Sequence, residues 1–225
     1  MAANPARRGL HTRAFDLASA APLVVLYASA IAGEVLNIRG QWSSARHALD
    51  YERIAADFVS LAFFGLQLAL FLFRRLPIGK SQGPWPRIAA LLGANANVAL
   101  LLLPKVSVAG TMETLSLAIS AAGTIGAFAV LAWLGRSFSI FPEARGLVTG
   151  GPYRVVRHPL YFFEIVATLG IMLRFRQPWA ALIALATLAF QFRRMAYEEA
   201  VLRAIYPEYD DYTRRTPARV MPGVY

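Results

Sequence analysis

Four long apolar stretches are the feature that most limits how this chain can fold. They run from about Phe15 to Leu36, from Ile54 to Phe73, from Ile88 to Leu103 and from about Leu115 to Leu134. Each is roughly 16 to 22 residues long, close to the ~20 that a helix needs to cross the hydrocarbon of a bilayer. Because backbone groups have no water to bond there, each stretch is expected to be helical. The sequence predicts an all-α, polytopic membrane helix bundle.

Composition agrees with a membrane location. Hydrophobic residues make up 57% of the chain and charged residues 16%, against about 25% charged residues in an ordinary soluble domain. This balance excludes a disordered chain and a typical soluble enzyme. The first stretch is too long for a signal peptide and contains Glu34, so we interpret it as a retained helix.

Two later apolar stretches are shorter. Leu160–Leu173 and Trp179–Phe192 have about 14 residues each, a length more typical of re-entrant or protein-buried helices than of full spans. We expect them to form a tilted or partly inserted helical hairpin, followed by an interfacial helix over Arg193–Ile205. The chain is therefore divided into N-terminal transmembrane helices over residues 1–134 and a second region over residues 135–225.

The basic residues suggest an orientation. The net charge is +10, and the arginines lie in short segments between apolar stretches, which favours contact with an anionic leaflet over nucleic-acid binding. The clusters are Arg7, Arg8 and Arg13; Arg74, Arg75, Lys80 and Arg87; and Arg136, Arg145, Arg154 and Arg157, whereas the third loop has only Lys105. The excess of positive charge inside predicts that the N-terminus, the second loop and the region from Gly135 onward face the cytosol.

Groups capable of chemistry are concentrated after Gly135. Gly150-Gly151-Pro152 predicts a turn that lets backbone groups approach a ligand closely. His158 precedes Pro159, which is suited to the first turn of a helix. The positive end of that helix, together with Arg157 and His158, favours binding of an anion such as a carboxylate.

Each of these residues also has a simpler explanation. Arg157 could be a membrane anchor, Tyr153 and Tyr161 could belong to an interfacial aromatic belt, and Glu199 and Arg203 have the spacing of a surface ion pair. These explanations do not account for their concentration in about 90 residues, beside a His-Pro pair and a Glu-Glu pair. The chain has no cysteine, which excludes thiolate chemistry and Cys-ligated metals, and no metal site is indicated.

Two motifs carry a resemblance to a known family. Gly-Pro-Tyr-x-x-x-Arg-His-Pro-x-Tyr over Gly151–Tyr161, followed by Arg-x-x-x-Glu-Glu over Arg194–Glu199, resembles the isoprenylcysteine carboxyl methyltransferases. The related phospholipid methyltransferases share the Arg-His-Pro and Glu-Glu elements. The resemblance covers about Gly135 to Pro222.

The resemblance implies a membrane-embedded methyltransferase that uses S-adenosylmethionine, bound by a cytosolic C-terminal region, and a lipophilic or lipidated substrate that arrives from the lipid bilayer. It implies that the cofactor contacts are Gly146, Leu147, Val148, Tyr153, His158, Pro159, Leu160, Tyr161 and Glu198. It places the substrate-orienting, catalytic arginine at Arg194. A planar guanidinium suits a carboxylate nucleophile, which is already ionised and needs no general base.

One departure from the family bears on the substrate. Phe163 stands where the family usually has a small residue, and Glu164 follows it inside an apolar stretch, so both are candidate substrate-binding residues. Carboxyl O-methylation of an isoprenylcysteine-like molecule is the first hypothesis. Phospholipid N-methylation and small-thiol S-methylation are alternatives. A non-enzyme alternative is a small transporter or scaffold with a polar path through Glu34, Asp57, Asn95, Asn97 and Glu164.

Overall fold

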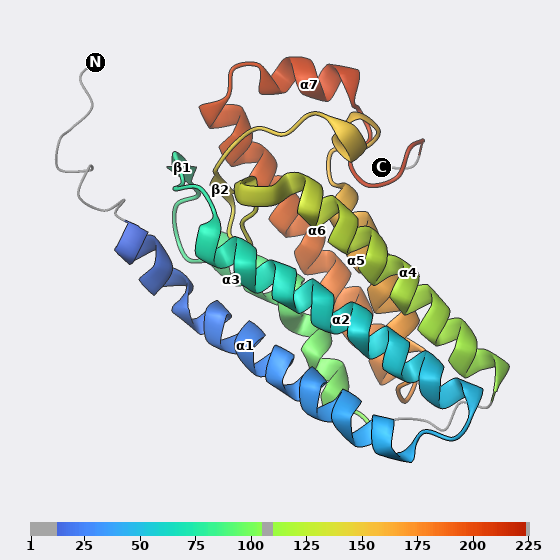
Figure 1. The fold of residues 1–225 in the computed structure, drawn as a ribbon. Coiled ribbons are helices and arrows are strands. Elements are labelled where there is room, and N and C mark those ends of the chain that lie inside the picture. The colour runs from blue at the N-terminus through green and yellow to red at the C-terminus, as the bar shows by residue number, and fades with distance from the viewer. Residues whose placement is uncertain (1–12, 105–109, 224–225) are drawn as a thin grey trace.

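The computed structural model describes residues 13–104 and 110–223, and Figure 1 shows their fold. Arg7, Arg8 and Lys105, which contribute to the predicted orientation, lie outside the described residues.

Helices form nearly all of the regular structure. The α-helices are α1 (Arg13–Ser44), α2 (Ala48–Phe73), α3 (Trp85–Asn95), α4 (Thr111–Leu134), α5 (Pro159–Met172), α6 (Trp179–Ile205) and α7 (Tyr209–Arg215). Short 3₁₀ helices occur at η2 (Ala96–Leu102), η3 (Gly135–Ser137) and η4 (Gly151–Arg154), and the two-residue strands β1 (Gly79–Lys80) and β2 (Glu143–Ala144) pair antiparallel. The predicted all-α membrane bundle is confirmed.

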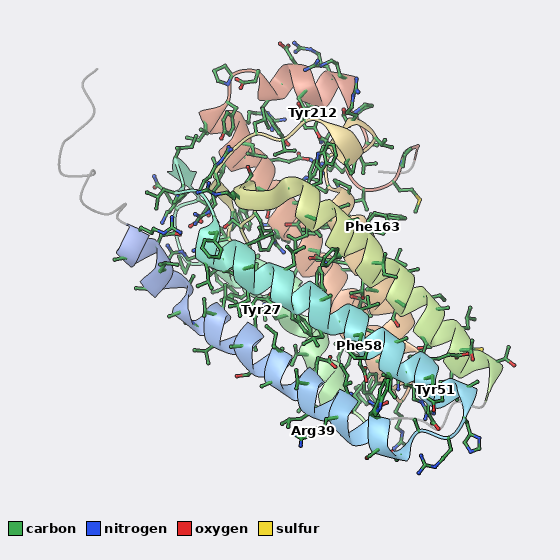
Figure 2. All side chains as sticks on the ribbon, viewed as in Figure 1. Tyr27, Arg39, Tyr51, Phe58, Phe163 and Tyr212 are labelled. Atoms are coloured by element: carbon green, nitrogen blue, oxygen red, sulfur yellow. The ribbon has the colours of Figure 1, made fainter. Side chains whose placement is uncertain are left out.

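Three helical segments of the described chain are long and apolar enough to cross a bilayer: Ala20–Ser44, Ala48–Phe73 and Thr111–Ser137. Many large apolar side chains point outward from the bundle, among them Phe58, labelled in Figure 2. Contiguous apolar surface of this kind is unfavourable in water and marks contact with lipid or protein. The lipid bilayer is the environment that these helices fit.

The helices pack in pairs. The most extensive contacts between helices are those of α4 with α5, α1 with α2 and α3 with α6. Helix α7 lies across one end of the bundle (Figure 1). Tyr27 of α1 stacks on Phe71 of α2 with 5.7 Å between ring centroids, and both belong to a buried cluster that extends to Leu131 and Phe138. This cluster lies directly beside the residues of the candidate site.

Two predicted helix boundaries were wrong. The stretch Ile88–Leu103 is not one α-helix, because α3 ends at Asn95 and continues as the 3₁₀ helix η2. The Asn95 side chain donates a hydrogen bond to the Leu91 carbonyl (3.0 Å), and such side-chain bonds compete with the helical ladder. The predicted separate helix over Arg193–Ile205 is instead the second half of α6, since no proline or glycine interrupts the chain from Trp179 to Ile205.

Candidate active site

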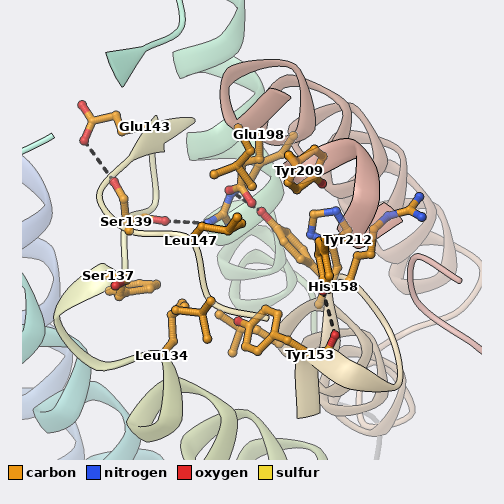
Figure 3. Close-up of a pocket in the computed structure, with 18 of the residues that line it drawn as sticks. Leu134, Ser137, Ser139, Glu143, Leu147, Tyr153, His158, Glu198, Tyr209 and Tyr212 are labelled. Atoms are coloured by element: carbon orange, nitrogen blue, oxygen red, sulfur yellow. Dashed lines mark hydrogen bonds and ion pairs between the residues drawn. The ribbon is translucent and has the colours of Figure 1, made fainter. Parts of the chain in front are cut away.

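A pocket opens at the end of the bundle where α4 stops. Its walls come from η3, the irregular chain around β2, the start of α5, the polar half of α6, and α7 (Figure 3). It encloses about 90 Å³ of free space. Among the residues predicted to contact a cofactor, those that line it are Gly146, Leu147, Val148, Tyr153, His158, Leu160, Tyr161 and Glu198. Arg194 lines the pocket as well, and Pro159 does not.

The segment leading into the pocket depends on two glycines with left-handed backbone. Gly135 ends α4 with φ of 54°, and Gly151 begins η4 with φ of 59°. A Cβ on Gly151 would lie within 2.7 Å of the indole nitrogen of Trp133. Because other residues avoid this backbone region and the ring leaves no room for a side chain, Gly151 suits this close approach better than any other residue. The turn at Gly151 brings Tyr153 back over the end of α4.

The loop between η3 and η4 is tied to α1 by buried charges. Arg145, which is fully buried, donates to Asp16 of α1 over 2.7 Å and to Glu143 over 2.5 Å. Arg74, at the end of α2, donates to the same Asp16 over 2.9 Å. Buried ion pairs of this kind lose several kcal/mol when one partner is removed. This cluster therefore anchors the chain just before Gly146–Val148, and it gathers three separated segments at one end of the bundle.

Glu199 organises the first turn of α5. Its carboxylate accepts hydrogen bonds from Arg157 Nε (2.9 Å), His158 Nε2 (3.1 Å) and Arg219 Nη2 (3.1 Å). The surface pair with Arg203, which was the simpler explanation for Glu199, does not form, because Arg203 donates instead to Asp210 over 2.7 Å. The bond to Glu199 occupies one ring nitrogen of His158, so the other is the nitrogen that a ligand in the pocket can contact.

The C-terminal segment is held against the same turn. The backbone N–H groups of Arg157 and His158 donate to the carbonyls of Ala218 and Arg219 over 3.0 and 2.8 Å. The Tyr212 hydroxyl of α7 donates to the Tyr153 carbonyl over 2.8 Å, as Figure 3 shows. Tyr209 and Tyr212 both line the pocket. Helix α7 is thus part of the pocket wall, and residues 218–219 pack against the turn before α5.

Arg194 and Glu198 project from one face of α6 and bond to each other. Arg194 Nε donates to Glu198 Oε1 over 3.2 Å, and Tyr161 donates its hydroxyl proton to the same oxygen over 2.6 Å. The guanidinium also donates to the Ser139 carbonyl over 3.3 Å and lies 4.8 Å from the centre of the Tyr161 ring. These contacts fix the Arg194 side chain, which is 2% exposed, whereas Glu198 is 20% exposed toward the pocket.

A second cavity, of about 160 Å³, lies deeper among the helices. It adjoins Tyr27 of α1, Gln67 of α2, Asn95 and Glu164, and its boundary with the first pocket is formed by Phe138 and Arg194, which line both. Glu164 accepts a hydrogen bond from Gln191 of α6 over 3.2 Å.

Phe163 lies elsewhere. It does not line either cavity but packs on α4, where a Cβ on Gly126 would collide with its ring. Of the three residues predicted to contact substrate, Arg194 and Glu164 therefore line a cavity and Phe163 does not.

Several lining residues were missed by the sequence analysis. Ser137, Ser139 and Glu143 line the pocket, and Glu143 accepts a hydrogen bond from the Ser139 hydroxyl over 3.1 Å. The deep cavity adds Gln67 and Gln191. A glutamine inside an apolar stretch is a usable signal in both cases, since a polar group in the bilayer is expensive unless it has a role. In the part of the chain that the structure describes, no group of three or more His, Asp or Glu side chains is placed to hold a metal ion.

Two comparisons with known proteins match this chain to methyltransferases. The phospholipid methyltransferase family matches residues 106–209. Protein-S-isoprenylcysteine O-methyltransferase B of Arabidopsis thaliana is 33% identical over 94 residues, which cover 38% of this chain and 47% of that protein. The resemblance predicted from the two motifs is confirmed, and both matches support a membrane methyltransferase.

Two further relatives are named as metal-resistance proteins. The nickel-cobalt-cadmium resistance protein NccN of Alcaligenes xylosoxydans xylosoxydans is 41% identical over 73 residues, covering 32% of this chain and 34% of that protein. The cobalt-zinc-cadmium resistance protein CzcN of Cupriavidus metallidurans is 39% identical over 75 residues, with the same two shares. The chain thus spans between 34% and 47% of the length of these curated relatives.

Proposed function

We propose that this protein is an integral membrane methyltransferase that takes its methyl group from S-adenosylmethionine and its acceptor from the bilayer. Arg194 carries the proposal, because it lines both the pocket at the end of the bundle and the cavity among the helices. A reaction between a polar cofactor and a lipophilic acceptor needs two compartments that meet at one point, and positioning supplies most of the acceleration in such a displacement.

The lining of the pocket suits the cofactor. S-adenosylmethionine supplies an electrophilic methyl group on a sulfonium, and it carries a carboxylate, an ammonium and a ribose. The partly exposed Glu198 can accept from the ammonium or a ribose hydroxyl, and the positive end of α5, where His158 and Leu160 line the pocket, favours the carboxylate. The backbone of Gly146–Val148 can bond the adenine edge.

Cofactor binding requires the pocket to widen. Its free volume of about 90 Å³ is below the roughly 300 Å³ at which ligand pockets begin. The wall with least regular structure is the chain between Phe138 and Gly150, where β2 is the sole strand. We propose that the part of this loop after Arg145 moves outward to admit the cofactor, while Arg145 stays bonded to Asp16 of α1 and anchors the start of that part.

The proposal includes the orientation of the protein in the membrane and the roles of its two regions. Residues 1–134 supply the membrane helices, and residues 135–225 supply the cofactor site, which faces the cytosol. Isoprenylcysteine-like carboxylates, phospholipid amines and small thiols remain the three acceptor classes. The transporter alternative needs a continuous polar path that includes Asp57. Asp57 is bonded to Asn37 and Gln41 of α1 (2.8 and 2.7 Å) and does not line the deep cavity, which disfavours this alternative.

The experiment is calorimetric titration of the detergent-purified protein with S-adenosylhomocysteine. We expect saturable binding by the wild type, and about tenfold or greater weakening in Glu198→Gln, which removes a charge-assisted contact. Arg194→Lys should bind within a few-fold of the wild type, because Arg194 serves the acceptor side. Glu52→Gln, at the opposite end of the bundle, is the matched control. Absence of binding by the folded wild type would overturn the proposed function.

A further inference from the structure

Asp16 is a buried charged residue of α1, outside residues 106–209, the part of the chain that matches the methyltransferase family. It lies in the first turn of α1 and is 4% exposed. Burial raises the pKa of its carboxyl group, but the hydrogen bonds and charges of Arg145 and Arg74 outweigh burial and hold that pKa below its ordinary value of 3.8. The carboxylate is therefore ionised at neutral pH, and a buried charge persists only where it is paired.

Two arginines share this carboxylate, and they lead to different parts of the molecule. Arg74 donates through Nε to Asp16 Oδ2 over 2.9 Å and through Nη2 to the Asp16 carbonyl over 3.2 Å. These bonds join α1 to the end of α2, two helices that already pack against each other. Arg145 donates through Nη2 to Asp16 Oδ1 over 2.7 Å and through Nη1 to Oδ2 over 3.3 Å. This second pair joins α1 to the loop that lines the pocket.

Further contacts hold Arg145 on the pocket side. Its side chain is fully buried, and its Nε donates to Glu143 Oε2 over 3.1 Å. Glu143 also accepts from the Ser139 hydroxyl over 3.1 Å, as Figure 3 shows. The Ser139 carbonyl in turn accepts from Arg194 over 3.3 Å. A continuous series of hydrogen bonds thus runs from Asp16 to the residue that lines both the pocket and the deep cavity.

The residue after Arg145 begins the pocket lining. Gly146, Leu147 and Val148 all line the pocket, and because consecutive Cα atoms are about 3.8 Å apart, a displacement of Arg145 is passed directly to them. A Cβ on Gly146 would lie 2.6 Å from the Ser137 hydroxyl oxygen, so the chain runs close against η3 at this point. The position of this part of the lining therefore depends on where Arg145 is held.

We propose that Asp16 is a positioning residue of the cofactor site, which acts through Arg145 on Gly146–Val148. This rests on the proposed function and adds α1 to the elements that form the site. Without the Asp16 carboxylate, Arg145 would keep a buried positive charge with one counter-ion fewer, which is strongly unfavourable. The loop would move to relieve it, and cofactor binding would then have to restore the original position at the expense of affinity.

The test compares Asp16→Asn with Glu113→Gln. Glu113 is a matched control, because it is a largely buried carboxylate that also pairs with two arginines, Arg53 and Arg174 (2.8 and 3.9 Å), at the opposite end of the bundle. Both variants should melt at a lower temperature than the wild type. Titration with S-adenosylhomocysteine is done in detergent, well below every melting transition. We expect Asp16→Asn to weaken binding about tenfold or more, because it leaves Arg145 one counter-ion short, and Glu113→Gln to bind within a few-fold of the wild type.

Hydrogen exchange supplies a readout that a loss of overall stability does not move. In Asp16→Asn the backbone amides of residues 138–150 should exchange faster than in the wild type, whereas in Glu113→Gln they should exchange as in the wild type. Asp16→Glu keeps the negative charge beside Arg145, so it should bind S-adenosylhomocysteine more tightly than Asp16→Asn does.

The outcomes separate this inference from the proposed function. If folded Asp16→Asn binds S-adenosylhomocysteine as tightly as Glu113→Gln does, Asp16 has no positioning role and the methyltransferase proposal stands. If Asp16→Asn does not fold, Arg145→Lys decides, because one ammonium cannot reproduce the two-sided bonding of the guanidinium to Asp16 and Glu143; wild-type affinity in Arg145→Lys would overturn the inference. If the wild type does not bind S-adenosylhomocysteine, the proposed function itself fails.

Discussion

At the scale of single residues, Glu199 shows how one carboxylate sets the geometry of a binding turn. It is 3% exposed and lies on α6 beyond the apolar half that ends at Phe192. Burial opposes ionisation, but the hydrogen bond and charge of His158, together with the Arg157 guanidinium, lower the pKa of Glu199 to about 2. An ionised Glu199 therefore holds His158 and the C-terminal segment in place at neutral pH.

The lowered pKa predicts a loss of stability in acid. A carboxyl group with an ordinary pKa of 4.5 and a folded pKa of about 2 adds stability that is complete above pH 4.5 and is lost as the pH falls toward 2. The full effect is roughly 3 kcal/mol. We expect Glu199→Gln to melt at a lower temperature than the wild type at pH 7 and to show a flatter decline between pH 5 and pH 3.

Thermal unfolding followed by tryptophan fluorescence across that pH range measures both effects. Glu208→Gln, which removes an exposed carboxylate close to Glu199 in sequence, should retain the wild-type slope. Parallel slopes for wild type and Glu199→Gln would show that the carboxylate makes no net contribution to folding.

The family resemblance predicted more of the pocket lining than local spacing did. Of the cofactor contacts that it implied, Gly146–Val148, His158, Tyr161 and Glu198 line one pocket. Spacing failed for Glu199, because Arg157 and Arg219, which it binds, are 42 and 20 residues away along the chain. Contacts of that range depend on how the helices are brought together, which local patterns do not contain.

At the scale of elements, the contact between α4 and α5 positions the site. A Cβ on Gly123 would lie 2.7 Å from the Cα of Ala167, and one on Gly170 would lie 2.9 Å from the Cα of Ser120. The Ser116 hydroxyl also donates to the Gly170 carbonyl over 2.7 Å. Small residues that let backbones touch are a main source of helix association in membranes. Since α5 begins at Pro159, this contact fixes the turn that carries His158.

Gly123→Ala should therefore disturb both stability and cofactor binding. The new methyl group meets backbone atoms that cannot rotate away, and overpacking of this kind costs about 1–3 kcal/mol. We expect a lower melting temperature and weaker S-adenosylhomocysteine binding. Gly65→Ala is the matched control, because Gly65 lies in α2 with open space around its Cβ position, where alanine favours the helix by up to about 1 kcal/mol.

Melting curves and S-adenosylhomocysteine titrations of Gly123→Ala and Gly65→Ala, measured in parallel, test whether the contact between α4 and α5 positions the site. Equal behaviour of Gly123→Ala and Gly65→Ala would mean that α4 and α5 can separate without consequence for the site.

The long helices and the C-terminal ends of α2 and α4, at Phe73 and Leu134, could be predicted from the sequence, whereas the N-terminal ends of α2 and α4 and both ends of α1 could not. α1, α2 and α4 each extend beyond the apolar stretch that predicted them. Hydropathy marks the residues that face lipid, whereas a helix ends where its backbone bonds are replaced. The merging of two predicted elements into α6 has the same cause, since polarity changes after Phe192 but the backbone pattern does not.

At the scale of the whole molecule, the deep cavity could be predicted only in part, because Asn95, Asn97 and Glu164 of the predicted polar path line it but Gln67, Thr187 and Gln191 were not predicted. Its polar lining comes from α1, α2, α3, η2, α4, α5 and α6, and most of these helices contribute only one or two polar side chains to it. Each of these residues alone resembles a tolerated polar group in an apolar stretch. Their meeting point depends on the packing of the entire bundle, so the cavity becomes visible only in three dimensions.

The two ends of the bundle differ in charge, and this predicts its orientation. The pocket end carries Arg75, Arg87, Arg136 and Arg154 in addition to Arg74 and Arg145, which pair with Asp16, whereas at the other end Arg53 pairs with Glu113 over 2.8 Å. The unequal basic charge predicts that the pocket end faces the cytosol. The chain has no cysteine, so single cysteines can report the sidedness. Gln82 lies between β1 and α3 at the pocket end, Ser43 lies near the end of α1 at the other, and both are exposed.

We expect Gln82→Cys to react with a membrane-impermeant maleimide in inside-out vesicles and not in intact cells, and Ser43→Cys to show the reverse. Both variants should bind S-adenosylhomocysteine as the wild type does, because neither position lines the pocket, and the cysteine-free parent is the labelling control. Reaction of Gln82→Cys in intact cells would place the pocket outside the cytosol. It would thereby remove the cofactor supply on which the proposed reaction depends, since S-adenosylmethionine must reach the site from the compartment that the pocket faces.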